Sequence, residues 1–167
     1  RKSGKNDTND AEAICEAVGR PNMRFVSVKS VEQQAVCSLH TGRQFLVVQR
    51  TALINHCRGL LTEFGIIMPL GADKVRRLFA EILDDEQSTV PLLLKDLLQQ
   101  HLQDLARLEH RIESIDKQLA EWAKTNHQAM TLLQMLGVGV ITATAFAAGV
   151  CDAQLFENGR QFAAWLG

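Results

Sequence analysis

The stretch that decides the fold runs from Leu92 to Lys124 and reads LLLKDLLQQHLQDLARLEHRIESIDKQLAEWAK. Its seam positions recur at alternating steps of three and four residues and are Leu98, His101, Leu105, Leu108, Ile112, Ile115, Leu119 and Trp122. This spacing predicts one long helix with a coiled-coil seam, in which His101 is the polar member. A seam of this length needs a partner, either another helix of this chain or a second copy. We expect a homo-oligomer through residues 92–124.

A second long helix is predicted from Ser30 to Phe64, a stretch that lacks proline. Its apolar stripe consists of Val36, Leu39, Leu46, Leu53, Cys57, Leu60 and Phe64. Arg43 and Arg50 fall on the same stripe, and Arg58 lies nearby. The aliphatic stems of these arginines could pack while their guanidinium groups reach water. Alternatively, this helix face meets phosphate.

Shorter elements complete a chain that we expect to be mainly α. A helix over Ala72–Leu83 follows a break rich in glycine, and another begins near Asp10 with Thr8 or Asn9 as its N-cap. The alternating residues Phe25–Lys29 predict a short strand. With 46% apolar and 22% charged residues, the composition excludes a disordered chain.

The segment from Thr125 to Cys151 carries no formal charge, yet its polar side chains and mid-segment glycines argue against a membrane span. Two short buried helices joined at Gly137 and Gly139 fit better. An apolar-Gly-apolar-Gly turn is typical of a helix-hairpin-helix, whose backbone N–H groups bind DNA phosphates without reading sequence. Close packing of two helices would explain the glycines equally well.

Charge divides the chain into a basic and an acidic half. Residues 1–77 carry twelve Lys or Arg and seven acids, a net +5, whereas residues 78–167 carry six and twelve, a net −6. A basic half can meet a polyanion. The chain has no tyrosine and only 5% aromatic residues, which argues against a base-stacking platform. The four dispersed cysteines exclude a zinc ribbon and a disulfide scaffold.

The acidic pair Asp7 and Asp10 straddles a predicted helix start and follows Lys5. Two carboxylates at this spacing could share a hard divalent cation of the kind that phosphoryl chemistry uses. Acids at this position also favour the helix dipole, which is the plainer explanation. Two acids are too few for a closed two-metal site.

Four ordered sequence blocks resemble insertion-sequence transposases with a DEDD acidic site, the bridge-RNA-guided recombinases. These blocks are KNDTNDAEAI (5–14), RTALINHCRGLLTEFGI (50–66), LGVGVITA (136–143) and LFENGRQFAAWLG (155–167). The resemblance implies that the chain is a central fragment with three parts. Residues 1–66 would form the C-terminal part of an RNase H/resolvase-like α/β catalytic domain. Residues 67–124 would form a helical coiled-coil segment, and residues 125–167 would form the start of a C-terminal transposase domain with the helix-hairpin-helix.

The same resemblance implies a chemistry. Lys5, Asp7 and Asp10 match the family's K-x-D-x-x-D-A motif, so both aspartates would be catalytic and would hold Mg²⁺. The remaining Asp and Glu are expected upstream of residue 1 and the nucleophilic serine beyond residue 167, so the fragment alone is expected to be inactive. The implied reaction is Mg²⁺-dependent, serine-assisted DNA strand cleavage and exchange during transposition. Leu136 departs from the proline that relatives usually carry before the hairpin.

The partners implied are DNA and a guide RNA, in the bacterial cytoplasm near the nucleoid and without a membrane. The expected nucleic-acid-binding residues are Lys5, Arg43, Arg50, Arg58, Gly137 and Gly139. A non-catalytic, dimeric helix-hairpin-helix DNA-binding scaffold is the alternative function.

Overall fold

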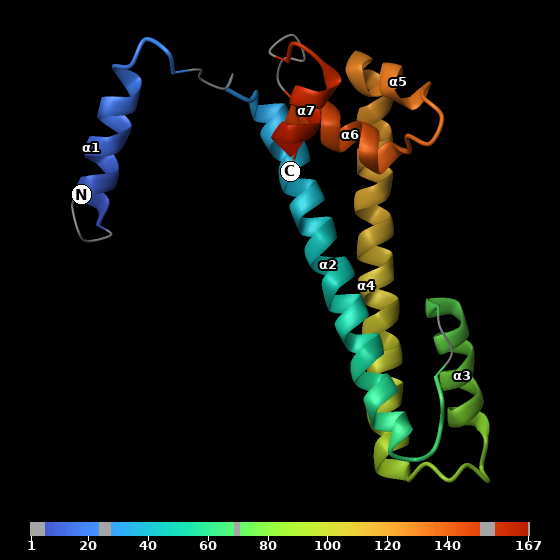
Figure 1. The fold of residues 1–167 in the computed structure, drawn as a ribbon. Coiled ribbons are helices and arrows are strands. Elements are labelled where there is room, and N and C mark those ends of the chain that lie inside the picture. Colours follow the sequence, from blue (N-terminus) through green and yellow to red (C-terminus); the bar gives the residue numbers. More distant parts are fainter. Residues whose placement is uncertain (1–5, 24–27, 69–70, 151–155, 167) are drawn as a thin grey trace. The chain divides into compact units, whose positions relative to one another are not determined.

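The computed structural model describes residues 6–23, 28–68, 71–150 and 156–166 (Figure 1). Its helices are α1 (Asp7–Val18), α2 (Val31–Thr62), α3 (Ala72–Asp84), α4 (Leu92–Thr125), α5 (His127–Leu133), α6 (Val140–Gly149) and α7 (Gly159–Leu166). The prediction of a mainly α chain is confirmed, and the described ranges contain no strand. Residues 25–27 of the predicted strand lie outside those ranges.

Contacts divide the chain into two compact units. One is Lys29–Val150, which holds α2 to α6, and the other combines Arg1–Val28 with Cys151–Gly167. The predicted boundaries after residues 66 and 124 both fall inside the first unit, at the ends of α2 and α4. No described helix is long and apolar enough to cross a membrane.

Helices α2 and α4 lie side by side as a long antiparallel pair (Figure 1). Antiparallel packing follows from two contacts, Arg43 with Asp116 near one end and His56 with His101 towards the other. Helix α2 begins with a capping box, in which Ser30 Oγ accepts from the Gln33 backbone N–H and Gln33 Oε1 accepts from the Ser30 N–H. This reciprocal pair satisfies two N–H groups that would otherwise lack partners at the helix start.

The predicted seam of α4 is buried inside the chain. Leu98, Leu105, Ile112 and Leu119 are all at most 6% exposed. The helices α2, α3 and α6 of the same chain pack against these side chains. Of the two partners that the sequence left open, the structure therefore selects another helix of this chain. A homo-oligomer through residues 92–124 stays a prediction, and it would have to use a different face of α4.

Helix α3 closes the core at the end of the pair where α4 begins. Val75, Phe79 and Ile82 are buried against Leu98 and Leu105. The connection from α2 to α3 uses two positive φ angles, +72° at Gly65 and +101° at Gly71. Glycine adopts this left-handed region without a steric penalty, so the turns after α2 and before α3 can form.

Helices α5 and α6 pack on the other end of the pair through small side chains. Ala129, Ala143, Ala147 and Ala148 are buried, and α6 contacts α2, α4 and α5. Small residues let helix backbones approach closely. Asn126 ends α4 and caps α5, because its Oδ1 accepts from the Ala129 backbone N–H at 3.0 Å.

His101, the polar member of the seam, packs beside His56 with ring centroids 5.4 Å apart. Its Nε2 is buried and has no hydrogen-bond partner among the described residues. Burial lowers the pKa of His101, the nearby His56 lowers this pKa further, and Asp104 opposes the shift.

Replacing His101 by leucine is expected to raise the free energy of unfolding by about 1 kcal/mol at pH 7, because an unsatisfied buried nitrogen is removed. The gain should grow at pH 5, since a histidine whose pKa is lowered by folding destabilises the folded state once it is protonated. Urea unfolding at both pH values measures this, with His110→Leu at an exposed site of the same helix as control. Unchanged or lower stability of His101→Leu would contradict the prediction.

Candidate nucleic-acid interface and acidic pair

The acidic pair lies in the first turn of α1, and both carboxylates are exposed. Asn6 is the N-cap, with its Oδ1 accepting from the Asn9 backbone N–H at 2.8 Å. The prediction of Thr8 or Asn9 as the cap is therefore wrong. The extended backbone of Asn6 brings its short amide within reach of Asn9, and the helix begins at Asp7 instead of Asp10.

The donor set around Asp7 and Asp10 is incomplete. Two exposed carboxylates on one helix turn offer the oxygen ligands that Mg²⁺ prefers, and they suit it as part of a larger set. Within the described ranges, no group of three or more His, Cys, Asp and Glu side chains could hold a metal ion. Lys5, which completes the predicted motif, lies outside these ranges.

The three predicted arginines of α2 differ in their surroundings. Arg43 forms a two-pronged ion pair with Asp116 of α4, with Nε 2.5 Å from Oδ1 and Nη2 3.3 Å from Oδ2. Arg58 donates from Nη1 to Asn55 Oδ1 at 2.6 Å on an exposed surface. Arg50 is half-buried, and no described carboxylate pairs with it. Arg43 thus joins two helices, whereas the charge of Arg50 is not compensated by any carboxylate of the described residues.

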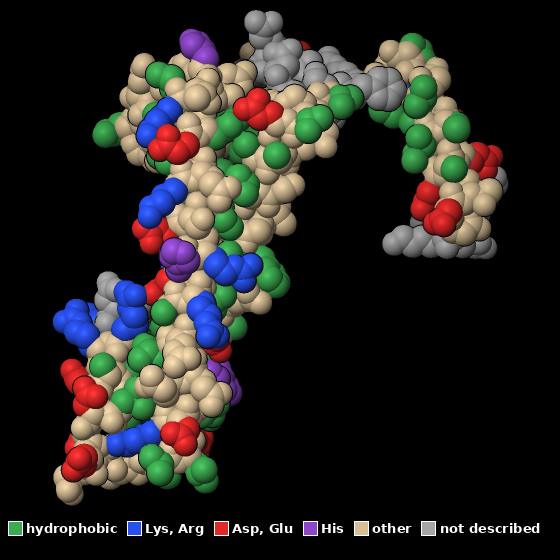
Figure 2. Space-filling model, turned by 180° about the vertical axis from the view of Figure 1, so that it is seen from behind, with side chains coloured by type: hydrophobic (Ala, Val, Ile, Leu, Met, Phe, Trp, Pro, Cys, Tyr) green, Lys and Arg blue, Asp and Glu red, His purple; other side chains and the backbone are tan. Residues whose placement is uncertain are grey.

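Basic side chains also occur outside α2. Figure 2 shows Lys and Arg side chains over the middle of the α2–α4 pair and over α3, with acidic side chains among them. On α3, Arg76 pairs with Glu109 of α4, whereas Lys74 and Arg77 are exposed. The basic character of the first half therefore reaches the surface, but several of its charges are already paired.

The predicted glycine hairpin connects α5 to α6. Gly137 has a φ of +87°, and Gly139 is the N-cap of α6. Among the residues that the structure describes, no side chain caps this helix start, so the first backbone N–H groups of α6 stay available to an anion. Leu136, next to the hairpin, is fully exposed. The structure thus confirms two short helices joined at the glycines.

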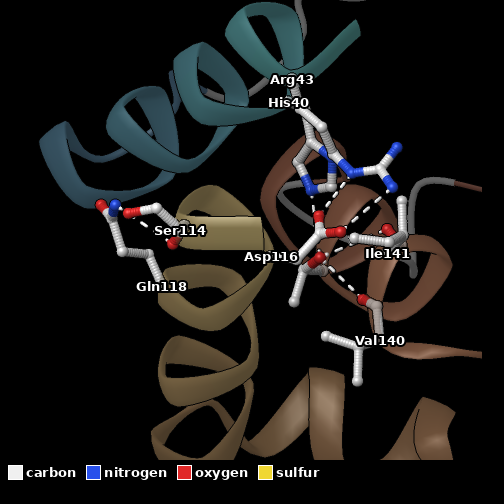
Figure 3. Close-up of polar contacts among 8 residues, drawn as sticks. His40, Arg43, Ser114, Asp116, Gln118, Val140 and Ile141 are labelled. Atoms are coloured by element: carbon white, nitrogen blue, oxygen red, sulfur yellow. Dashed lines mark hydrogen bonds and ion pairs between the residues drawn. The ribbon is translucent and has the colours of Figure 1, made fainter. Parts of the chain in front are cut away.

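A polar cluster that was not predicted from the sequence lies where α2, α4 and α6 meet. His40 Nε2 lies 3.0 Å from Oγ1 of Thr144, a side chain that is 0% exposed (Figure 3). Burial lowers the pKa of His40, as does the adjacent Arg43, while Asp116 opposes the shift. Thr144, a hydroxyl within the apolar helix α6, was the available signal.

A family model and several proteins named transposases match this chain. The family described as "Transposase IS116/IS110/IS902 family" matches residues 129–167. A probable family 20 transposase of Pseudomonas aeruginosa is 45% identical over 167 residues, which are 99% of this chain and 49% of that protein. The putative transposase y4pF/y4sB of Sinorhizobium fredii is 39% identical over 166 residues, 99% of this chain and 42% of that protein.

A third relative is also named a transposase. The transposase for insertion sequence element IS1111A of Coxiella burnetii is 40% identical over 166 residues, 99% of this chain and 46% of that protein. The chain spans about half the length of these curated relatives. No solved structure matches the chain significantly. By these matches the chain is similar over nearly its whole length to proteins named transposases, and residues 129–167 match the family described as "Transposase IS116/IS110/IS902 family".

Proposed function

We propose that this chain is the central part of a DNA transposase that cleaves and exchanges DNA strands in insertion-sequence transposition. The observation that carries the proposal is the similarity over 99% of the chain to proteins named transposases. The finer domain assignment, an RNase H-like end at residues 1–66 and a helix-hairpin-helix within 125–167, is part of this proposal.

Asp7 and Asp10 would supply two carboxylates to a Mg²⁺ site completed by acids outside this chain. Both side chains are exposed on one helix turn, where a phosphate can approach them. When bound, Mg²⁺ would stabilise the charge on the attacking and leaving oxygens of the scissile phosphate. A serine from outside these residues would be the nucleophile, which gives a covalent protein–DNA intermediate.

Two surfaces of the unit Lys29–Val150 would bind nucleic acid. The uncapped start of α6 and the turn at Gly137 and Gly139 offer backbone N–H groups to DNA phosphates. Arg50 offers a guanidinium without a described partner and would bind guide-RNA phosphate. Arg43 and Arg58, which already donate to Asp116 and Asn55, would contribute less.

We expect Arg50→Ala to lower the slope of log RNA affinity against log salt by about one unit, because one phosphate contact and its counterion release are lost. Arg43→Ala should leave this slope nearly unchanged and reduce stability instead, since it leaves Asp116 unpaired. The measurement is binding of an RNA copied from the insertion sequence at several salt concentrations. Arg107→Ala, an exposed arginine of α4, is the control.

The matched change in the hairpin is Gly139→Ala. A Cβ at Gly139 would have no heavy atom within 4 Å, so the fold should tolerate it. Duplex DNA binding should weaken, because the methyl group hinders the approach of a phosphate, while the salt slope stays the same. An unchanged RNA slope in Arg50→Ala would show that this arginine only packs against its helix. Unchanged DNA binding in Gly139→Ala would remove the hairpin from the proposed interface.

A further inference from the structure

We propose that His40, Thr144, Arg43 and Asp116 form a proton-sensitive latch that holds α6, and with it the Gly137–Gly139 hairpin, against α2 and α4. The link from this latch to DNA rests on the proposed function of the hairpin. The latch itself rests on the contacts of the cluster and does not depend on that function.

The four side chains come from three helices. His40, Arg43 and Asp116 lie close together in Figure 3, and Thr144 joins them through its contact with His40. His40 and Arg43 lie one turn apart on α2, Asp116 comes from α4 and Thr144 from α6. The His40–Thr144 contact of 3.0 Å joins α2 to α6, and the Arg43–Asp116 pair joins α2 to α4. Helix α6 carries no ionisable side chain, so its polar tie to this cluster is the Thr144 hydroxyl.

The hydrogen bonds fix which nitrogen of His40 carries the proton. Thr144 Oγ1 lies 2.8 Å from the Val140 carbonyl oxygen and 3.2 Å from that of Ile141. Carbonyl oxygens only accept, so the hydroxyl hydrogen of Thr144 must be donated to them. His40 Nε2–H is therefore the donor to Thr144 Oγ1. In the neutral ring Nδ1 carries the lone pair, and a second proton must be added there.

A second proton makes His40 a cation beside Arg43 in a partly dehydrated junction. Burial and Arg43 both lower the pKa of His40, and Asp116, already engaged by Arg43, only partly offsets them. A group whose pKa is lowered by folding stabilises the folded state above its ordinary value, about 6.5 for histidine, and this stability is lost as the pH falls through the lowered value. The latch is therefore closed at neutral pH and weakened by acid.

The position of Thr144 in α6 carries this effect to the hairpin. Gly139 is the N-cap of α6, and Thr144 follows it by five residues, about 7.5 Å along a helix axis. A change in how Thr144 is held thus moves the hairpin within the same short helix. The large side chains near the hairpin do not oppose such motion, since Met135 and Leu136 are exposed.

The test follows α6 and DNA separately in the full 167-residue chain. Amide hydrogen exchange of α6 and titration of the His40 ring are measured by NMR from pH 7.5 to 5, and affinity for a short DNA duplex is measured over the same range. His40→Gln keeps an N–H donor but cannot be protonated in this range. His127→Gln, at an exposed histidine of α5, is the matched control.

In the parent and in His127→Gln, protection of α6 should fall on acidification after correction for intrinsic exchange. The fall should be about tenfold for each unit by which folding lowers the pKa of His40, and DNA affinity should fall with it. In His40→Gln, the protection of α6 and the DNA affinity should both be independent of pH.

The latch would be overturned if α6 protection in the parent is independent of pH, or if a folded His40→Gln shows an equal fall in protection. If His40→Gln does not fold, the pH dependence of α6 amide exchange and the His40 ring titration in the parent decide whether the latch exists. If α6 protection in the parent falls on acidification but the parent binds no DNA at any pH, this result would support the latch and contradict the proposed function.

Discussion

A chain in which Leu105 is replaced by aspartate is expected to lose its folded helical pair. Leu105 is 1% exposed and belongs to the core that Leu98, Phe79 and Cys57 share. Truncating a buried leucine costs about 2–5 kcal/mol, and placing a carboxylate there without a partner costs several more. The sum approaches the whole stability of a typical domain, roughly 5–15 kcal/mol.

Circular dichroism melts and sedimentation measure this outcome together. Leu93→Asp is the matched control, because Leu93 lies on the same helix and is 87% exposed. The control should fold like the parent, whereas Leu105→Asp, alone or with Ile112→Asp, should be largely unfolded at room temperature. A folded monomeric Leu105→Asp beside a parent that sediments as a dimer would show that the seam joins two chains. The intrachain packing of α2 on α4 would then be contradicted.

Helix positions could be predicted from spacing because the signal lies within each segment. The stripe of Ser30–Phe64 and the seam of Leu92–Lys124 repeat with helical periodicity, and the observed α2 and α4 end within two residues of these limits. What covers the seam is not a local property. An apolar seam fits a helix of its own chain or of a second chain equally well, so the sequence left both open.

In the candidate site too, features set by neighbouring residues could be predicted, whereas contacts between residues far apart in the sequence could not. The sequence predicted Asp7 and Asp10 on either side of a helix start, whereas the structure places both in the first turn of α1 with Asn6 as the N-cap. The roles of Arg43 and His40 could not be predicted, because their partners lie 73 and 104 residues away. An arginine on an apolar stripe is equally consistent with a phosphate contact and with an ion pair to a distant carboxylate.

Replacing Asp7 or Asp10 by asparagine is expected to abolish DNA strand cleavage and exchange by a full-length transposase that contains this segment. Asparagine keeps the size of the side chain but removes the charge that a Mg²⁺ ligand supplies. The fold should hardly change, since both residues are exposed and the helix start is capped by Asn6. Loss of a favourable interaction with the helix dipole costs only about 0.3–1 kcal/mol.

The matched controls are Glu12→Gln and Glu16→Gln, which neutralise exposed acids later in the same helix. If Asp7 and Asp10 only favour the start of α1, all four variants should resemble the parent in activity. Thermal melts of each variant separate lost chemistry from lost folding.

The most direct test is Mg²⁺-dependent joining of insertion-sequence DNA to target DNA by that transposase, compared between Asp7→Asn, Asp10→Asn and the two glutamine controls. We expect no joined product from either asparagine variant, with melting temperatures near that of the parent, and normal product from both controls. Joining at the parental rate by a folded Asp7→Asn or Asp10→Asn variant would contradict this expectation.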